Sequence, residues 1–310
     1  MEKFDIIIIG AGPAGMTSAL NCLRAGKTVL ILESENFGGQ IAFSPRVENF
    51  PTYPKISGAE LMDKLYEQIV EWGARVELEC ATNVEKTQDC FIVTTDYSQY
   101  ECYSVILATG VKPRHIGVER EEELIGKGVS YCALCDGAFY SGEDVAVIGD
   151  ANTAIQYAVV LSGYCRHVHV CALFGRLFAD KALIDLMESR DNVSVRYHLS
   201  LKEFIADDEL KGLRFEDTET HEQVNVDCKC AFVCIGQTPK NKAFEELVEL
   251  DKTGYIIADE SCATSCEGVF AAGDCRTKSI RQLVTAASDG AVAAFNACKY
   301  VDAFRTLRNV

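Results

Sequence analysis

A glycine-rich turn near the start of the chain constrains the fold more than any other feature. An apolar run leads into Gly10-Ala11-Gly12-Pro13-Ala14-Gly15, which a helical pattern follows. Glycines in such a turn permit a tight bend, a close approach of backbone to ligand, and close packing of helix on strand. We therefore predict a strand over residues 5–10, a helix over 13–25 and a second strand over 28–33, which form a βαβ unit.

The same pattern occurs a second time in the middle of the chain. A strand is predicted over residues 144–149, a helix over 152–162 and the paired strand over 167–173. Two such units predict an α/β fold with two doubly wound, Rossmann-like dinucleotide-binding domains, the second inserted in the first.

Glycine and proline mark two crossings between these domains. Short apolar strands end at Gly110 and Gly236, and each is followed within three residues by a proline. A carboxy-terminal helix over residues 282–300 is expected to complete the first domain. The predicted domains are thus residues 1–113 with 241–310, and residues 114–240.

The first glycine turn has the partners that a dinucleotide requires. Glu33 ends the second strand, where a carboxylate can accept hydrogen bonds from an adenosine ribose. Gly273-Asp274, just before the last helix, suits the ribityl and pyrophosphate part of a long cofactor. A glycine turn with a purely structural role is the alternative interpretation.

A C-x-x-C motif, Cys132-Ala133-Leu134-Cys135, is followed directly by Asp136. Two thiols across one turn can close a disulfide, and the carboxyl can shuttle the proton that exchange chemistry requires. Half of a zinc ribbon is the alternative, but the chain lacks a second C-x-x-C, so no metal site is expected. Most of the fifteen cysteines are interpreted as reduced, buried small residues.

Together these residues resemble the low-molecular-weight thioredoxin reductase family over nearly the whole chain. The resemblance also includes Gly38 to Gln40, Val47 to Pro51, Ala108 to Gly110 and Arg281-Gln282. It implies that Cys135 faces a flavin, that Cys132 attacks the disulfide of thioredoxin, that Asp136 is the acid/base, and that the protein is a homodimer. It further implies FAD bound by Gly10, Gly12, Pro13, Ala14, Gly15, Glu33, Gly39, Gln40, Asn49, Ala108, Thr109, Gly110, Gly273, Asp274, Arg281 and Gln282.

The second βαβ unit departs from the family where NADPH normally binds. Its turn reads Gly149-Asp150-Ala151, which places a methyl group and a negative charge where pyrophosphate would approach. The family's arginine cluster is replaced by Ala172-Leu173-Phe174, with Phe178 at the last arginine position, so nothing at those positions pairs with a 2′-phosphate. Arg176 is nearby but lies off the pattern. Ala172 also gives no carboxylate for NADH. This combination resembles the ferredoxin-dependent flavin thioredoxin reductase subgroup, which implies reduced ferredoxin as the electron donor.

Three other functions remain open. The chain could be an NAD(P)H-dependent thioredoxin reductase with a degenerate site, an FAD dithiol oxidase that uses oxygen, or a flavin protein whose cysteines are only structural. Whether a second flavin or another ligand occupies the degenerate site stays open as well.

The charge and hydropathy of the chain restrict its partners. A formal net charge of −16 disfavours binding to nucleic acid or to an anionic membrane. No segment is apolar enough to span a bilayer, and the amino-terminal apolar run is too short for a signal peptide, so we expect a cytoplasmic protein. Because ferredoxins are usually acidic, docking would need a local basic patch, for which the candidates are Lys240, Lys242, Arg276 and Lys278.

Overall fold

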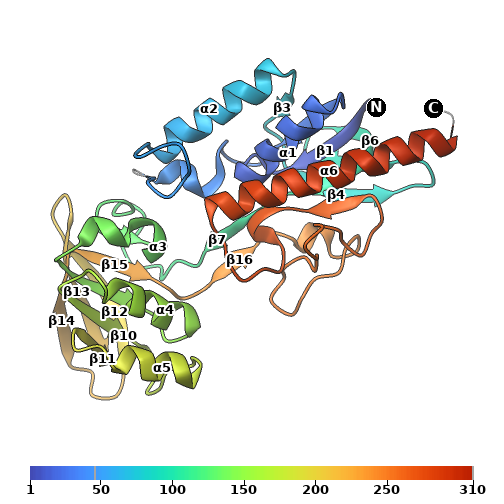
Figure 1. The fold of residues 1–310 in the computed structure, drawn as a ribbon. Helices are drawn as coiled ribbons and strands as arrows, with labels where there is room; N and C mark the ends of the chain where they lie inside the picture. The colour runs from blue at the N-terminus through green and yellow to red at the C-terminus, as the bar shows by residue number, and fades with distance from the viewer. Residues whose placement is uncertain (45–46, 309–310) are drawn as a thin grey trace. The chain divides into compact units, whose positions relative to one another are not determined.

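The computed structural model describes residues 1–44 and 47–308, and the chain folds into two compact units (Figure 1). One unit comprises Met1–Lys112 with Thr238–Val310, and the other comprises Pro113–Gln237. Each is built on a mainly parallel sheet, which confirms the predicted α/β class. Two short strands in the connecting segments, β7 (Val111–Pro113) and β16 (Gln237–Pro239), pair with each other.

The first unit contains a seven-stranded sheet with the order β3-β2-β1-β6-β5-β4, in which β17 also pairs with β6. β1, β2, β3, β6 and β17 are parallel, whereas β4, β5 and β6 form an antiparallel part. The strands are β1 (Glu2–Ile9), β2 (Val29–Leu32), β3 (Arg75–Glu77), β4 (Ala81–Lys86), β5 (Phe91–Thr95), β6 (Gln99–Leu107) and β17 (Val269–Ala271).

The sheet has a separate hydrophobic core on each face, because alternate residues of β1 point to opposite sides. Ile6 and Ile8 are buried in one core with residues of α1 and α6, while Ile7 and Ile9 belong to a second core on the other face. The helices of the unit are α1 (Pro13–Arg24), α2 (Gly58–Glu71) and α6 (Leu283–Arg308), with short 3₁₀ turns η1 (Gly39–Phe43), η3 (Lys242–Phe244) and η4 (Gly273–Cys275).

The second unit contains a five-stranded parallel sheet with the order β11-β10-β9-β15-β8 and a three-stranded antiparallel sheet, β12-β13-β14. Val145 and Val147 pack with residues of α4, whereas Ala146 and Ile148 share a core with the antiparallel sheet. The elements are β8 (Val129–Ser130), α3 (Ala133–Asp136), η2 (Gly137–Tyr140), β9 (Asp144–Ile148), α4 (Asn152–Leu161), β10 (His167–Cys171), α5 (Lys181–Glu188), β11 (Val193–Arg196), β12 (Leu199–Ala206), β13 (Leu210–Asp217), β14 (Gln223–Asp227) and β15 (Cys230–Val233).

Both predicted βαβ units are present, and most of their predicted ends differ from the observed ends by one to three residues. The last helix differs more, since it continues to Arg308 instead of ending at residue 300. In the described part of the chain, no helix combines the length and apolar character needed to cross a bilayer.

Candidate functional site

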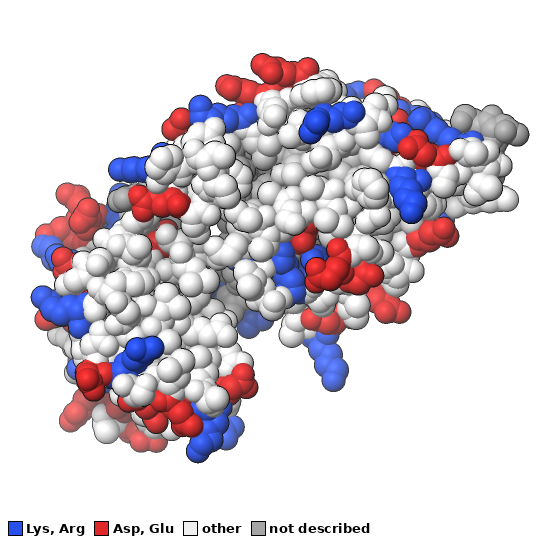
Figure 2. Space-filling model, viewed as in Figure 1, with Lys and Arg blue, Asp and Glu red and all other residues white. Residues whose placement is uncertain are grey.

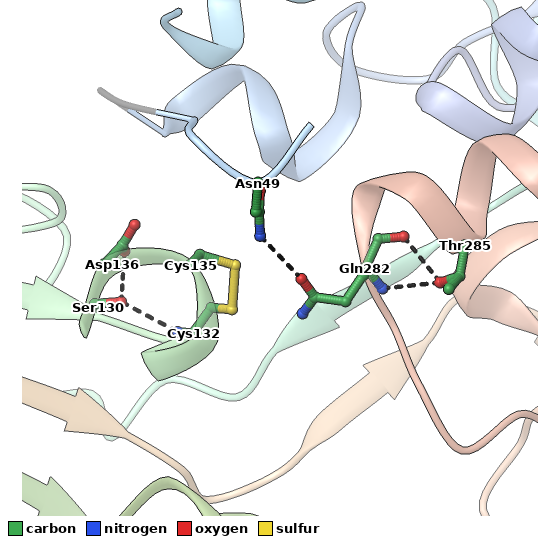
Figure 3. Close-up of a disulfide and its surroundings, with 7 residues drawn as sticks. All are labelled: Asn49, Ser130, Cys132, Cys135, Asp136, Gln282 and Thr285. Atoms are coloured by element: carbon green, nitrogen blue, oxygen red, sulfur yellow. Dashed lines mark hydrogen bonds between the residues drawn. A yellow bond between two sulfur atoms is a disulfide. The ribbon is translucent and has the colours of Figure 1, made fainter. Parts of the chain in front are cut away.

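The two cysteines of the C-x-x-C motif form a disulfide at the start of a short helix in the second unit (Figure 3). Cys132 is the residue before α3, and Cys135 lies within it. Their Cα atoms are 5.3 Å apart, a normal separation for a disulfide. The backbone N–H groups of Cys135 and Asp136 both donate to the carbonyl oxygen of Cys132, at 3.1 and 3.0 Å, which closes the turn around the disulfide.

A hydrogen-bonded chain links the motif to its carboxyl group (Figure 3). The backbone N–H of Cys132 donates to Ser130 Oγ at 3.1 Å, and the Ser130 hydroxyl donates to Asp136 Oδ2 at 2.6 Å. Asp136 Oδ1 is buried without a hydrogen-bond partner in the described residues. The sequence analysis did not predict a role for Ser130. The only indication in the sequence is its position two residues before the motif.

Burial sets the protonation of Asp136. Loss of solvation raises the pKa of its carboxyl group, and the hydrogen bond from Ser130 opposes this only in part. Asp136 therefore retains a proton to higher pH than an ordinary aspartate. A carboxyl group beside a dithiol with this property can donate and accept a proton during exchange.

The glycines of the first turn fulfil the steric roles predicted for them. Gly10 has φ +111°, and a Cβ there would lie 2.3 Å from the carbonyl oxygen of Ala108. A Cβ on Gly15 would lie 1.9 Å from the carbonyl oxygen of Gly10, so only glycine allows α1 to begin this close to β1. A Cβ on Gly12 would meet only the Cα of Gly39, at 3.9 Å, so the turn is open at the position where a phosphate approaches.

The other predicted residues of the first unit surround this turn. Glu33 Oε2 accepts the backbone N–H of Ala11 at 2.8 Å, which fixes the carboxylate beside the glycines. The N–H of Gly38 donates to the carbonyl oxygen of Ala11 at 2.8 Å and brings Gly39 against the turn. Gln40, next in the chain, donates its side-chain amide to the carbonyl oxygen of Val111.

The turn at Gly273 approaches the same place from β17. A Cβ on Gly273 would lie 2.8 Å from that of Ala14, the second residue of α1. Asp274 Oδ1 is buried without a hydrogen-bond partner in the described part of the chain, and burial raises the pKa of this carboxyl group to about 6. An unpartnered buried acceptor requires a donor, which the hydroxyl groups of a ribityl chain provide. The residues of this unit therefore fit FAD, with the open glycine turn for its pyrophosphate and Asp274 for its polyol.

Hydrogen bonds hold four further predicted residues in place: Asn49, Thr109, Arg281 and Gln282. Asn49 donates its side-chain amide to Gln282 Oε1 at 3.3 Å (Figure 3). Arg281 donates to the carbonyl oxygen of Asp274 at 3.3 Å. Thr109 donates its hydroxyl to Oδ1 of the fully buried Asn241 at 2.7 Å, so Asn241 supports this turn, although no sequence motif indicated it.

Two of the expected docking residues have a different role. Arg276 is buried, the Lys278 side chain is only 9% exposed, and both pair with Asp289, at 2.9 and 2.8 Å, so proposing them as candidates for a basic docking patch was wrong. Lys240 pairs with Glu35, and Lys242 is exposed. On the face in view, acidic and basic side chains are interspersed over both units (Figure 2).

The second glycine turn is hydrogen-bonded to the segment that follows β10, and Ala151 stays exposed. The N–H of Phe178 donates to the carbonyl oxygen of Asp150 at 2.6 Å, and Phe178 forms a β-bridge with Ala151. Asn152, the first residue of α4, exchanges two hydrogen bonds with Asp180, at 2.8 and 3.2 Å. Burial raises the pKa of the Asp150 carboxyl group, and a hydrogen bond from its own backbone opposes this in part.

Phe174 and Phe178 occupy two of the positions at which the family has arginines. The rings of Phe174 and Phe178 meet edge to face at 5.5 Å, and the guanidinium group of Arg176 lies 4.6 Å from the ring centre of Phe178. Both phenylalanines are about half exposed, so the surface beside the turn carries two aromatic rings together with the exposed Arg176.

Comparisons with known proteins agree with these features. Residues 4–290 match the family model described as pyridine nucleotide-disulphide oxidoreductase. A protein named "34.2 kDa protein in rubredoxin operon" from Clostridium pasteurianum is 40% identical and covers 97% of this chain and 98% of its own length. A thioredoxin reductase from Treponema pallidum is 38% identical, with 99% of both chains covered.

Solved structures with a similar fold are also thioredoxin reductases. The thioredoxin reductase of Streptococcus pyogenes superposes with a TM-score of 0.93 at 35% identity, covering 97% of this chain and 99% of that one. A ferredoxin-flavin thioredoxin reductase from Clostridium acetobutylicum is a more distant neighbour, with 26% identity, a TM-score of 0.55, and 99% and 100% of the two chains covered. The thioredoxin reductases of this family use FAD as their cofactor. This chain belongs to the pyridine nucleotide-disulphide oxidoreductase family, in its low-molecular-weight thioredoxin reductase group.

Proposed function

We propose that this protein is an FAD-dependent reductase of the thioredoxin disulfide, driven by reduced ferredoxin instead of NADPH. The observation that carries the reductase is the Cys132–Cys135 disulfide with the buried Asp136 hydrogen-bonded to the same turn. We further propose that the first unit binds FAD and that the second is a scaffold for the dithiol. Thioredoxin as the substrate is supported by relatives that bear the name thioredoxin reductase.

The chemistry of the dithiol balances without another reactant. The Cys132 thiolate attacks one sulfur of the thioredoxin disulfide, which forms a mixed disulfide and expels the other sulfur as a thiolate. Cys135 then attacks Cys132 Sγ, which releases the second thioredoxin thiolate and restores the Cys132–Cys135 bond. Each departing sulfur needs a proton, and Asp136, whose pKa is raised by burial, is the acid next to the motif. When bound, FAD supplies the ability to take single electrons from a donor and to deliver two to a disulfide.

The proposed donor follows from the second glycine turn. A nicotinamide dinucleotide needs an open turn for its pyrophosphate and, for NADPH, cationic side chains at its 2′-phosphate. In this chain the turn carries Asp150 and Ala151, Phe178 hydrogen-bonds across it, and Phe174 stands beside it. Each difference disfavours a separate part of the same ligand.

The energetics allow ferredoxin in this role. A plant-type ferredoxin near about −400 mV and a thioredoxin near about −270 mV differ by roughly 130 mV, so two electrons fall by about 6 kcal/mol. The reaction then proceeds downhill without a nicotinamide.

The test is an anaerobic titration of the purified protein with NADPH, NADH and reduced ferredoxin in parallel, followed by flavin bleaching and by turnover with oxidised thioredoxin. We expect bleaching and turnover with ferredoxin only, and one FAD per chain. A Cys132→Ser/Cys135→Ser double variant is the matched control, since it should still bleach but should not reduce thioredoxin.

Each alternative gives a different result. Rapid bleaching and turnover with NADPH or NADH would overturn the proposed donor and leave a nicotinamide-dependent thioredoxin reductase. Dithiol consumption coupled to oxygen uptake, without thioredoxin reduction by any donor, would indicate an oxidase. The proposed homodimer is checked by the molar mass of the FAD-loaded protein in solution.

A further inference from the structure

A second pair of cysteines lies where helices α1 and α6 of the first unit pack together. Small residues bring the two backbones close: a Cβ on Gly290 would lie only 2.3 Å from the carbonyl oxygen of Ala14. The hydroxyl of Ser18 donates to the carbonyl oxygen of Gly290 at 3.0 Å. The helices therefore touch along a seam of small side chains.

The same register places Cys22 beside Cys298. Cys22 lies eight residues beyond Ala14 on α1, and Cys298 lies eight residues beyond Gly290 on α6. Further along, Lys27 forms an ion pair with Asp302, so the two segments stay together past the cysteines. Both cysteines belong to one buried core, in which Cys22 is fully covered and Cys298 is 8% exposed.

Each of the two thiols affects the ionisation of the other. The Cys22 thiol and the nearby Lys27 ammonium group lower the pKa of the Cys298 thiol, while its burial opposes them. Cys298 and burial together raise the pKa of Cys22. A thiolate is the form that reacts.

A surface hollow gives a small oxidant access to this pair. The hollow has a volume of about 730 Å³, and its lining includes Cys298, Phe295 and Leu307. Cys22 does not line it. An oxidant that enters therefore meets Cys298 before Cys22, which is fully buried in the same core.

We propose that Cys22 and Cys298 form a second dithiol, separate from Cys132 and Cys135, which a hydroperoxide converts to a disulfide between α1 and α6. The Cys298 thiolate attacks the O–O bond, which gives a sulfenic acid and releases an alcohol, or water from hydrogen peroxide. The Cys22 thiol then attacks the sulfenic sulfur and expels water. In sum two thiols and one hydroperoxide give one disulfide, one alcohol and one water.

The test uses the FAD-loaded protein with Cys132→Ser/Cys135→Ser, so that the other dithiol cannot contribute. Hydrogen peroxide is added in increasing amounts, free thiols are alkylated under denaturing conditions, and peptides are analysed by non-reducing mass spectrometry. We expect a peptide pair joined through Cys22 and Cys298 with the loss of two hydrogen atoms, which dithiothreitol reverses. Cys262 and Cys275, which are buried in the same unit with raised pKa values, are the internal control and should stay unlinked.

Single variants separate the two roles. Added to this background, Cys22→Ser should leave Cys298 as a sulfenic acid that dimedone labels, whereas Cys298→Ser should leave Cys22 reduced at the same peroxide concentration. The proposal is overturned if Cys298 is oxidised in the protein that retains both cysteines without the linked peptide, or if Cys22 and Cys298 both remain reduced when exposed cysteines are fully oxidised.

Discussion

Arg276 and Asp289 form a buried bidentate ion pair, with Nε and one terminal nitrogen of the guanidinium group each 2.9 Å from a different carboxylate oxygen. Lys278 donates to the same carboxylate at 2.8 Å, and the backbone N–H of Gly273 donates to it at 3.0 Å. Asp289 on α6 therefore fixes the turn that carries Asp274, the proposed polyol ligand of FAD.

We predict that Asp289→Asn destabilises the FAD-binding unit and weakens FAD retention. Burial alone would raise the pKa of Asp289, but the hydrogen bonds from Arg276 and Lys278 outweigh it and hold the pKa low. Removing one partner of a buried ion pair typically costs about 3–5 kcal/mol, because the remaining charge is left uncompensated. Thermal unfolding and the FAD-to-protein absorbance ratio measure the two effects.

The matched control for this change is Glu60→Gln in the same unit. Glu60 is also paired with a lysine, Lys64, but both side chains are exposed, at 60% and 48%, so the loss should be below about 1 kcal/mol. Because the pKa of Asp289 is lowered by folding, its contribution is present at neutral pH and is lost as the pH falls through that lowered pKa. Equal losses for the two variants would contradict the assigned role.

We predict that Asp136→Asn slows thioredoxin reduction by about 10²-fold or more, the usual range for a lost proton donor. The measurement is a single turnover of pre-reduced enzyme with oxidised thioredoxin, which does not depend on the donor. Asp150→Asn is the control, because burial also raises its pKa but it lies outside the dithiol. A rate unchanged by Asp136→Asn would remove this residue from the mechanism.

Stability should respond to pH in the opposite sense from Asp289. Folding raises the pKa of Asp136, so its favourable contribution is complete below the ordinary aspartate pKa and is lost as the pH rises through the raised value. The Asp136→Asn variant cannot ionise and should not show this loss. Denaturant unfolding of both proteins over that pH range tests the difference.

We predict that the two motif cysteines have separable roles. Cys135→Ser should accumulate a mixed disulfide between Cys132 and thioredoxin, because the resolving thiol is gone. Cys132→Ser is the matched control and should trap none. Non-reducing gels and intact mass identify the adduct, and trapping by Cys132→Ser alone would exchange the two assignments.

Local sequence patterns were sufficient for the parts of the site that a few adjacent residues build. Gly10 and Gly15 need a missing Cβ within one turn, and Cys132 and Cys135 need only a spacing of three, so both were predictable. Asp289 contacts Arg276, and Asn241 contacts Thr109, through the folded chain, so no local pattern reveals them.

Charge patterns in the sequence were misleading for the same reason. Arg276 and Lys278 were interpreted as surface residues because the sequence does not show burial, and only the folded structure brings Asp289 to them. The β-bridge between Ala151 and Phe178 is likewise a contact between segments 27 residues apart. The substitutions that indicated loss of the NADPH site were visible in the sequence. The backbone hydrogen bond between Phe178 and Asp150 was not.

We predict that Asp150→Gly, Ala151→Gly, Leu173→Arg and Phe174→Arg together restore NADPH binding. The glycines would remove a methyl group and a negative charge from the turn, and each arginine would add a charge-assisted phosphate contact worth about 1.5–3 kcal/mol. Two such contacts would tighten binding by roughly 10²- to 10⁴-fold. Equilibrium dialysis of NADPH against the FAD-loaded variant measures this without requiring turnover.

The matched control keeps both glycines but carries Leu173→Gln and Phe174→Gln, which are polar without charge. If missing cations limit the site, the arginine variant should bind NADPH more tightly than the glutamine variant, and the difference should shrink with salt because it is electrostatic. NADH lacks the 2′-phosphate, so it should bind both variants alike. Equal NADPH affinities for the two variants would contradict the importance assigned to the missing cations.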